Sequence, residues 1–259
     1  MDSVNRTLYI PLCGKALVSR KGLFLQDPKA EEIWDAEGFP LKGKAKSRWL
    51  AYNMGMRSAV FDRWLADVLT QMPQALVLHL GCGLDSRCNR VKCPNPWYDV
   101  DFPAVIEERK KYFAESDAYH MIGCDLRENW LTSVPKGGTA IVVMEGVSMY
   151  LTGEERQKLL KALTDHFDRV SLLVDAYTVF AAKATKYKNP INDVGVTQVY
   201  GFDDPRELEN GTGFSYVREH DMTPEAMIRS LSFWEQLLFR KLFAGKTAKK
   251  FYRLYEYEA

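Results

Sequence analysis

The chain has 259 residues, of which 46% are hydrophobic, and a formal net charge of +1 at pH 7. This length suits one large domain, or one domain with an added cap, and the near-neutral charge argues against a nucleic-acid partner and against a polybasic membrane patch. No apolar run reaches the roughly 18 residues that a membrane-spanning helix needs, and the first residues lack the pattern of a signal peptide, so we expect a cytoplasmic protein without a membrane partner.

The first 72 residues are predicted to form a helical cap that belongs to the same domain as the rest of the chain. Residues 47–72 repeat apolar side chains with the period of one long amphipathic helix or two. Pro73 ends this pattern just before the first strand. The core is therefore expected over residues 73–259.

Five apolar runs alternate with helical patterns in the core, an order that is typical of a parallel α/β sheet. Their length and aliphatic content predict strands that are buried on both faces. They span residues 75–80, 97–101, 119–123, 140–144 and 170–176. Helices are predicted between them over residues 103–113 and 152–167, and Thr152 with Glu155 has the spacing of a capping box.

The last third of the chain changes character after the fifth run. Residues 177–213 are polar and glycine-rich, and we expect them to form a lid or a substrate-binding insertion. Residues 214–222 have a strand pattern, residues 224–243 a helical one, and residues 251–259 alternate like a final strand.

The chain has five cysteines, an odd number that argues against a disulfide framework in a protein without a secretory signal. Cys82, Cys88 and Cys93 lack the paired Cys-x2-Cys spacing of structural zinc sites. We therefore expect reduced thiols near the core and no bound metal.

The first strand runs into a loop with two glycines, Gly81 and Gly83, where a parallel sheet presents its ligand-binding edge. Glycine lets a ligand approach the backbone closely. The third glycine of the dinucleotide pattern G-x-G-x-x-G is missing, and the carboxylate of Asp85 would repel a pyrophosphate. The loop therefore suits a ligand with a cationic part, or it is a tight turn without a ligand.

Acidic residues end the next strands of the predicted sheet. Asp99 and Asp101 are two apart and so share one face of their strand, and Asp101 lies where a carboxylate can accept both hydroxyls of a ribose. Asp125 follows the third strand and Glu145 the fourth. A ligand with a ribose, a base and a positive centre but no phosphate fits this arrangement. S-adenosylmethionine is such a ligand.

Three stretches of these residues together resemble the leucine carboxyl methyltransferase family, including its bacterial branch linked to polyketide O-methylation. They are LGCGLDSR, WYDVDFPAVIEERK and VMEGVSMYL, and IPLCGKALVSR and MGMRSAVFDRWL add weaker likeness upstream. The resemblance spans roughly residues 9–178. It implies a Rossmann-like class I methyltransferase sheet of about seven strands whose last strand, residues 251–259, is antiparallel.

The resemblance also implies how S-adenosylmethionine would bind. Arg57 would clamp its carboxylate, with Lys15 reaching down from the cap. Gly81 would lie against the methionine moiety, Gly83 would also belong to the cofactor-binding site, and Glu145 would face the ammonium group.

Two further contacts are implied at the nucleoside end. Asp101 would hold the ribose hydroxyls, and Asp125 with the backbone of Leu126 would meet the adenine. Arg87 is expected to pair with Asp85 or with another strand-end acid. Ser86 stands where the family has threonine, and it keeps the hydroxyl group.

The methyl acceptor stays open at the level of the sequence. Family members act on small carboxylates and hydroxyls or on a protein C-terminal carboxylate, and we expect a small molecule. A hydroxyl acceptor would need a base, for which Asp175 is the candidate because His79 is expected to be buried. Residues that could shape the acceptor pocket, or only pack or solvate the insertion, are Tyr177, Phe180, Lys183, Lys186, Lys188 and Tyr200.

Two other functions remain open. A nicotinamide-dependent oxidoreductase would use the same type of sheet, although the missing glycine and Asp85 count against it. A catalytically silent protein could use the methyltransferase fold only to bind partners. The oligomeric state is not indicated by the sequence.

Overall fold

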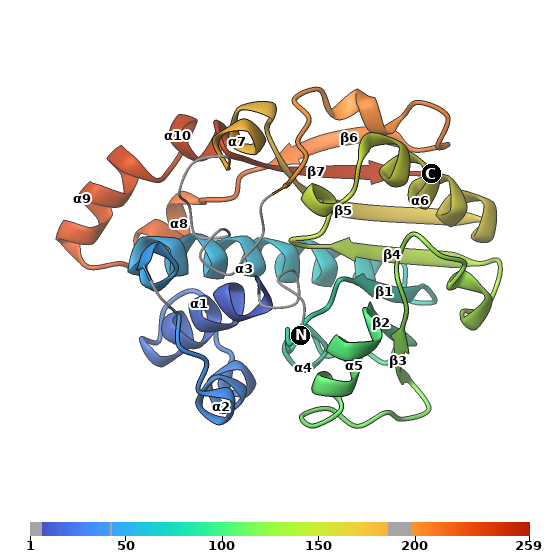
Figure 1. The fold of residues 1–259 in the computed structure, drawn as a ribbon, viewed down its shortest axis with the longest axis horizontal. Helices are drawn as coiled ribbons and strands as arrows, with labels where there is room; N and C mark the ends of the chain where they lie inside the picture. The colour runs from blue at the N-terminus through green and yellow to red at the C-terminus, as the bar shows by residue number, and fades with distance from the viewer. Residues whose placement is uncertain (1–6, 42, 186–197) are drawn as a thin grey trace.

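A seven-stranded sheet forms the centre of the protein (Figure 1). The computed structural model describes residues 7–41, 43–185 and 198–259. The strand order is β3-β2-β1-β4-β5-β7-β6, and β7 pairs antiparallel with both of its neighbours, whereas β1 to β5 are parallel. The strands are β1 Leu76–Leu80, β2 Trp97–Asp101, β3 Tyr119–Gly123, β4 Thr139–Met144, β5 Arg169–Tyr177, β6 Ser215–His220 and β7 Tyr252–Glu258. The predicted sheet with a reversed last strand is confirmed.

Both faces of the central strands β1, β4 and β5 are covered, which explains why these strands are largely apolar runs. The prediction that residues 119–123 are buried on both faces is wrong, because β3 is an edge strand whose residues are half-buried or exposed. Val77 and Ile141 point towards the long helix α3 (Arg48–Gln71), where they pack with Phe61 and Trp64. The next residue of each strand points the opposite way, and Leu78 packs with α6 (Gly153–His166) on the second face. The predicted capping box is present at the start of α6, where the Thr152 hydroxyl accepts from the Glu155 N–H.

The N-terminal helix α1 (Tyr9–Arg20) packs against α3 at one end of the sheet, and α2 (Pro28–Glu37) packs against α1 (Figure 1). Helix α3 is the single long helix that the apolar period of residues 47–72 allowed. It contacts α1 with one part of its surface and the sheet with another, so it joins the predicted cap to the core.

The C-terminal helical stretch differs from its predicted form. Residues 224–243 form two helices, α8 (Glu225–Ile228) and α9 (Phe233–Leu242), because Ser232 and Glu235 form a second capping box that starts a new helix. The predicted helix over residues 103–113 is shorter and ends at Arg109. The remaining short helices are η2 Gly43–Lys46, α4 Arg87–Arg90, α5 Pro103–Arg109, η3 Leu131–Ser133, η4 Ser148–Tyr150, α7 Val179–Ala184, η6 Pro205–Leu208 and α10 Lys246–Lys249.

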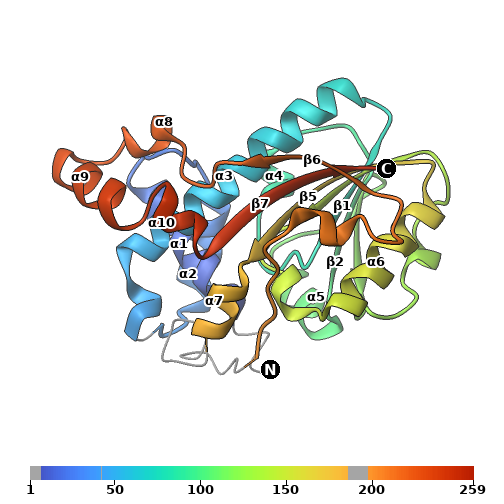
Figure 2. The same cartoon turned by 90° about the horizontal axis from the view of Figure 1, so that it is seen from above.

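Figure 2 shows that α8, α9 and α10 extend beyond the sheet on the side of α1. The helices α7 and η6 lie within the expected lid over residues 177–213, of which residues 186–197 fall outside the described part of the chain. No described helix has the length and apolarity that would let it cross a membrane.

Candidate functional site

A cavity of about 830 Å³ lies at the carboxyl ends of the central strands. Its walls come from the loop after β1, the ends of β2 to β4, the cap helices and the C-terminal helices. The predicted binding residues Lys15, Arg57, Gly81, Gly83, Asp101, Asp125, Leu126 and Glu145 all line it. Because the strand order is β3-β2-β1-β4, the ends that carry Asp125, Asp101, Gly81 and Glu145 follow one another along the sheet edge. The cavity is large enough for more than one small ligand group.

The loop after β1 is shaped by a close contact. Gly81 has a φ of +66°, and a Cβ at this position would lie 2.1 Å from Cγ2 of Val147. A side chain here would therefore clash and would also force a left-handed backbone on a residue other than glycine.

Replacing Gly81 with alanine should lower the free energy of unfolding by about 2–4 kcal/mol, the sum of left-handed strain and overpacking. Denaturant unfolding measures this loss. Gly22→Ala is the matched control, because Gly22 has a φ of +61° but no atom within 4 Å of the added Cβ. Val147→Ala should restore part of the loss in the Gly81 variant, and equal losses at both glycines would show that the contact with Val147 is unimportant.

Asp101 is held by the backbone around it. One of its carboxylate oxygens accepts the Gly83 N–H at 2.8 Å, and the other accepts the Phe102 N–H at 2.7 Å. Desolvation raises the pKa of Asp101 to about 6, although these two donors oppose the shift. A carboxylate oxygen has two acceptor positions, so both oxygens keep capacity for hydroxyl donors of a ligand.

The end of the cavity beyond Asp101 is mainly apolar. Phe102, Val105 and Leu126 line it, and Asp125 follows β3. The Asp125 carboxylate is paired with the guanidinium of Arg127 at 2.5 Å, which lowers the pKa of Asp125. An aromatic base could stack or pack against these walls, with the polar pair at the rim.

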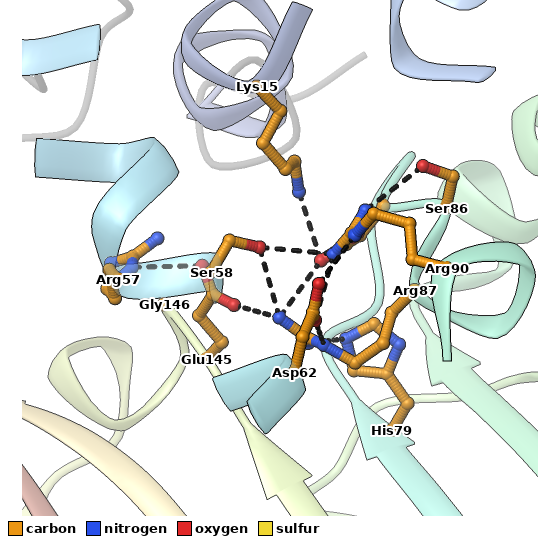
Figure 3. A network of polar contacts seen from close by, with 12 residues as sticks. Lys15, Arg57, Ser58, Asp62, His79, Ser86, Arg87, Arg90, Glu145 and Gly146 are labelled. Atoms are coloured by element: carbon orange, nitrogen blue, oxygen red, sulfur yellow. Dashed lines mark hydrogen bonds and ion pairs between the residues drawn. The ribbon is translucent and has the colours of Figure 1, made fainter. Parts of the chain in front are cut away.

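The opposite end of the cavity is ionic, as Figure 3 shows. Arg57 comes from α3 and donates from Nε to Glu145 at 3.0 Å and from Nη1 to Asp175 at 2.7 Å. Lys15 comes down from α1 to Asp85 at 3.0 Å. All five side chains are buried, so these charges interact with little screening by solvent.

Arg87 lies behind this end of the cavity and is fully buried. It donates to Asp62 at 2.7 Å and to Glu145, and it lies 3.4 Å from Asp85. The prediction that Arg87 pairs with strand-end acids is confirmed. Burial alone would raise the pKa of Glu145, but Arg87 and Arg57 lower it to about 2, so Glu145 is ionised at neutral pH.

Arg90 extends the same network, and the sequence analysis did not identify it. Its guanidinium contacts Asp27 at 2.5 Å, Asp62 at 2.7 Å and Asp85 at 2.8 Å. Asp27 is the residue before α2, and Asp85 lies in the loop after β1, so Arg90 connects the cap to that loop through two ion pairs. No sequence pattern marked this cluster, because its acids are far apart in the chain and α3 carries other charged residues besides Asp62.

His79 is buried in the middle of β1, as predicted. Its Nδ1 lies 3.1 Å from Asp99 and its Nε2 lies 3.0 Å from Arg87. Burial lowers the pKa of His79, so the imidazole is neutral at pH 7. Asp99 also pairs with Arg109 and Tyr119. Unlike Asp101, it is not among the described lining residues of the cavity.

A largely apolar part of the cavity, the acceptor compartment, is lined by residues of α3 and of the C-terminal half of the chain. Leu50, Met54 and Phe243 line it together with the rings of Tyr177 and Tyr252. These two rings meet edge to face with centroids 4.5 Å apart. Burial raises the pKa of Tyr252 well above its usual value, so its phenol remains protonated at neutral pH.

Asp175 does not belong to the described lining of this compartment. It is fully buried, it pairs with Arg57, and it accepts the Gly146 N–H at 2.7 Å. Burial raises the pKa of Asp175 to about 6, with Arg57 opposing the shift. Asp175 therefore contacts Arg57 and is not itself among the described lining residues, and its role as a base stays a prediction.

The other suggested acceptor residues are mostly elsewhere. Tyr177 lines the cavity, whereas Phe180, Lys183 and Tyr200 are not among the described lining residues. Phe180 is 59% exposed and packs against Phe251 at the surface. The remaining two lysines of the suggested patch, Lys186 and Lys188, lie outside the described residues.

Sequence comparisons place the chain among known methyltransferases. The family model described as leucine carboxyl methyltransferase matches residues 7–164. The tetracenomycin polyketide synthesis O-methyltransferase TcmP of Streptomyces glaucescens is 34% identical over 219 residues, which cover 81% of this chain and 79% of the relative. An S-adenosyl-L-methionine-dependent methyltransferase of Gibberella zeae is 29% identical over 183 residues, which cover 64% of this chain and 61% of that protein.

Solved structures agree on the fold. Magnesium protoporphyrin IX methyltransferase from Synechocystis PCC 6803 aligns with a TM-score of 0.51 at 15% identity, covering 88% of this chain and 93% of that one. A candidate methyltransferase from Thermobifida fusca YX aligns with a TM-score of 0.56 at 13% identity, covering 90% and 87%. The predicted Rossmann-like class I methyltransferase sheet is therefore confirmed.

Proposed function

The chain belongs to the leucine carboxyl methyltransferase family, and we propose that, as an S-adenosylmethionine-dependent methyltransferase, it methylates a carboxylate oxygen of a small molecule with an apolar body. The family excludes the nicotinamide-dependent oxidoreductase considered from the sequence. One observation supports a carboxylate acceptor. Every described carboxylate and imidazole that lines the cavity already has a polar partner, so none of them is free to act as a base.

The polar and charged residues of the cavity follow one another in the same order as the groups of S-adenosylmethionine that they would bind. Asp101 would accept the ribose hydroxyls, and Asp125 with Leu126 would meet the adenine beside Phe102. Glu145 and Asp85 would attract the ammonium group, and Lys15 and Arg57 the carboxylate. Nη2 of Arg57 donates to no protein acceptor among the described residues, so it has donors left for a ligand. When bound, this cofactor supplies an electrophilic methyl group on a sulfonium.

S-adenosylmethionine and its demethylated product should each raise the melting temperature of the purified protein, because a ligand that binds only the native state stabilises it. At 100 times the dissociation constant, the gain is about 2.7 kcal/mol. NAD and NADP should give no shift, since no part of the described loop is suited to a pyrophosphate. A shift with NAD and none with S-adenosylmethionine would contradict the cofactor assignment.

The acceptor chemistry follows from which side chains are available. Each described carboxylate or imidazole that lines the cavity already has a partner: Asp85, Asp125 and Glu145 have cations, Asp101 has two backbone donors, and His79 has Asp99 and Arg87. A hydroxyl acceptor must lose a proton to a base, whereas a carboxylate is ionised at pH 7 and needs none. No described carboxylate or imidazole of the cavity is therefore free to take a proton from a hydroxyl, and this favours a carboxylate acceptor.

The pH dependence of turnover tests this proposal once a screen of small acids and phenols with labelled cofactor has found an acceptor. We expect a nearly flat rate from about pH 6.5 to 8, and Asp175→Asn should leave the shape of that profile unchanged. A phenol or alcohol acceptor would instead give a rate that rises with pH through one ionisation. Loss of that ionisation in Asp175→Asn, with cofactor binding intact, would assign Asp175 as the base and overturn the carboxylate. Absence of turnover with intact cofactor binding across the screen would favour a silent binding protein.

A further inference from the structure

Helix α9 exposes an apolar face that nothing in the described chain covers. Phe233 and Trp234 are 72% and 70% exposed, and Leu237, Leu238 and Leu242 are each between 45% and 54% exposed. These positions recur at the i, i+4 spacing of one helical face. Phe239 lies on the opposite side of α9 and is fully buried against α3, so the helix is apolar on two sides. Exposed apolar patches of this kind mark interaction sites.

Basic residues occur in the second half of α9 and in the segment that follows it. Residues 236–253 contain six lysines and arginines and no acidic residue. Arg240 pairs with Glu225, and Lys249 and Arg253 pair with Glu219.

The other three basic residues, Lys241, Lys246 and Lys250, are exposed and have no acidic partner in the described part of the chain. Lys241 falls between Leu237, Leu238 and Leu242 on the same helical face. Three lysines without an acidic partner in the described residues therefore lie on α9 or on the segment that directly follows it.

The helix that carries this face lies at one end of the molecule. Helix α9 projects beyond the sheet in both views, with α10 following it back towards β7 (Figures 1 and 2). Leu242 belongs to the apolar face and also lines the cavity, as does Phe251 after α10. The apolar face is therefore continuous with the wall of the acceptor compartment.

We propose that α9 and α10 dock the protein on an anionic lipid surface. This departs from the expectation of no membrane partner, because that expectation rested on the net charge of the whole chain, which does not show where the charges lie. A tryptophan, a phenylalanine and leucines on one side of a helix, with lysines among and beside them, are the features of helices that lie in the membrane interface. Long lysine side chains can bury their stems while their ammonium groups reach the lipid phosphates. An anionic bilayer matches both halves of this surface, since it offers negative charge at the level of the lysines and an apolar phase for the rings.

Co-sedimentation of the full chain with lipid vesicles tests the proposal. We expect binding to phosphatidylcholine vesicles that contain phosphatidylglycerol, weaker binding to pure phosphatidylcholine, and loss of binding as salt is added. Trp234→Ser with Leu238→Ser, and separately Lys241→Glu with Lys246→Glu, should each lower the partition coefficient at least about tenfold. These side chains are exposed, so the melting temperature and its shift with S-adenosylmethionine should be retained.

Two controls match these variants. Lys136→Glu with Lys158→Glu makes the same change in net charge at exposed lysines outside α9 and α10, and Val217→Ser removes an exposed apolar side chain on β6. Both should bind anionic vesicles like the unmodified chain. The proposal is overturned by absence of vesicle binding, by equal loss in the controls, or by a solution dimer that the Trp234→Ser, Leu238→Ser variant dissociates, which would make this face a contact between two copies. None of these outcomes bears on the methyl acceptor, because cofactor binding is measured separately.

Discussion

Replacing Arg87 with methionine should lower the free energy of unfolding by about 3–5 kcal/mol, the cost of removing one partner from a buried ionic cluster. Arg87 is 0% exposed and faces Asp62, Asp85 and Glu145. Methionine has a similar length but no charge, so it leaves these carboxylates with fewer cations in a site that water does not reach. Denaturant unfolding at pH 7 measures the loss.

Arg20→Met is the matched control for this experiment. Arg20 also pairs with two acids, Asp35 and Glu31, but its side chain is 42% exposed. Surface pairs contribute little, so this variant should lose at most about 1 kcal/mol. Equal losses of unfolding free energy in the two variants would show that burial does not increase the contribution of the Arg87 ion pairs to stability.

The same variant should change the acid stability of the protein. With the pKa of Glu145 at about 2 in the folded state, its ionised form stabilises the fold at all pH values above its unfolded pKa, and this contribution is lost as the pH falls towards 2. Removing Arg87 removes the largest of the groups that lower this pKa. The pKa of Glu145 in the folded protein should then lie closer to its unfolded value, so less of the remaining stability depends on its ionised form. The variant should therefore lose less stability between about pH 5 and pH 2 than the unmodified chain does.

Replacing Asp101 with alanine should weaken binding of S-adenosylmethionine at least about tenfold. A hydrogen bond to a charged group contributes about 1.5–3 kcal/mol, and 1.4 kcal/mol corresponds to a factor of ten. Titration calorimetry measures the dissociation constant. Asp165→Ala on α6, whose carboxylate pairs with Lys161 at the surface, should leave the constant unchanged. An unchanged constant in Asp101→Ala would remove this residue from the site.

The pH dependence of binding gives Asp101 a second signature. Ribose hydroxyls donate to the ionised carboxylate, and the pKa of Asp101 is about 6, so affinity should fall by up to about tenfold per pH unit below pH 6. Asp101→Asn should remove this slope. Any slope that remains in that variant would report Asp175, whose pKa is also about 6 and which contacts Arg57.

The sequence by itself determined the sheet and the row of site residues along its edge. Uninterrupted apolar runs such as residues 140–144 require burial on both faces, and only a parallel sheet covered by helices provides that. Parallel strands end at one edge, so Gly81, Asp101, Asp125 and Glu145 had to come together there. The spacing of 20 residues between Gly81 and Asp101 was therefore enough to predict that both lie at the same edge of the sheet.

Only the tertiary structure decided how the charges are partnered and which surfaces stay open. Asp27, Asp62 and Arg90 are far apart in the chain, and nothing in their local pattern distinguishes a buried ion pair from a solvated charge. The same holds for Asp175, since its position at a strand end does not reveal that Arg57 separates it from the cavity. Local periodicity likewise shows that α9 is amphipathic, but packing of Phe239 against α3 decides which face is buried. Trp234 and Lys241 are exposed as a result of that contact, because a helix that packs on one side leaves its other side in solvent.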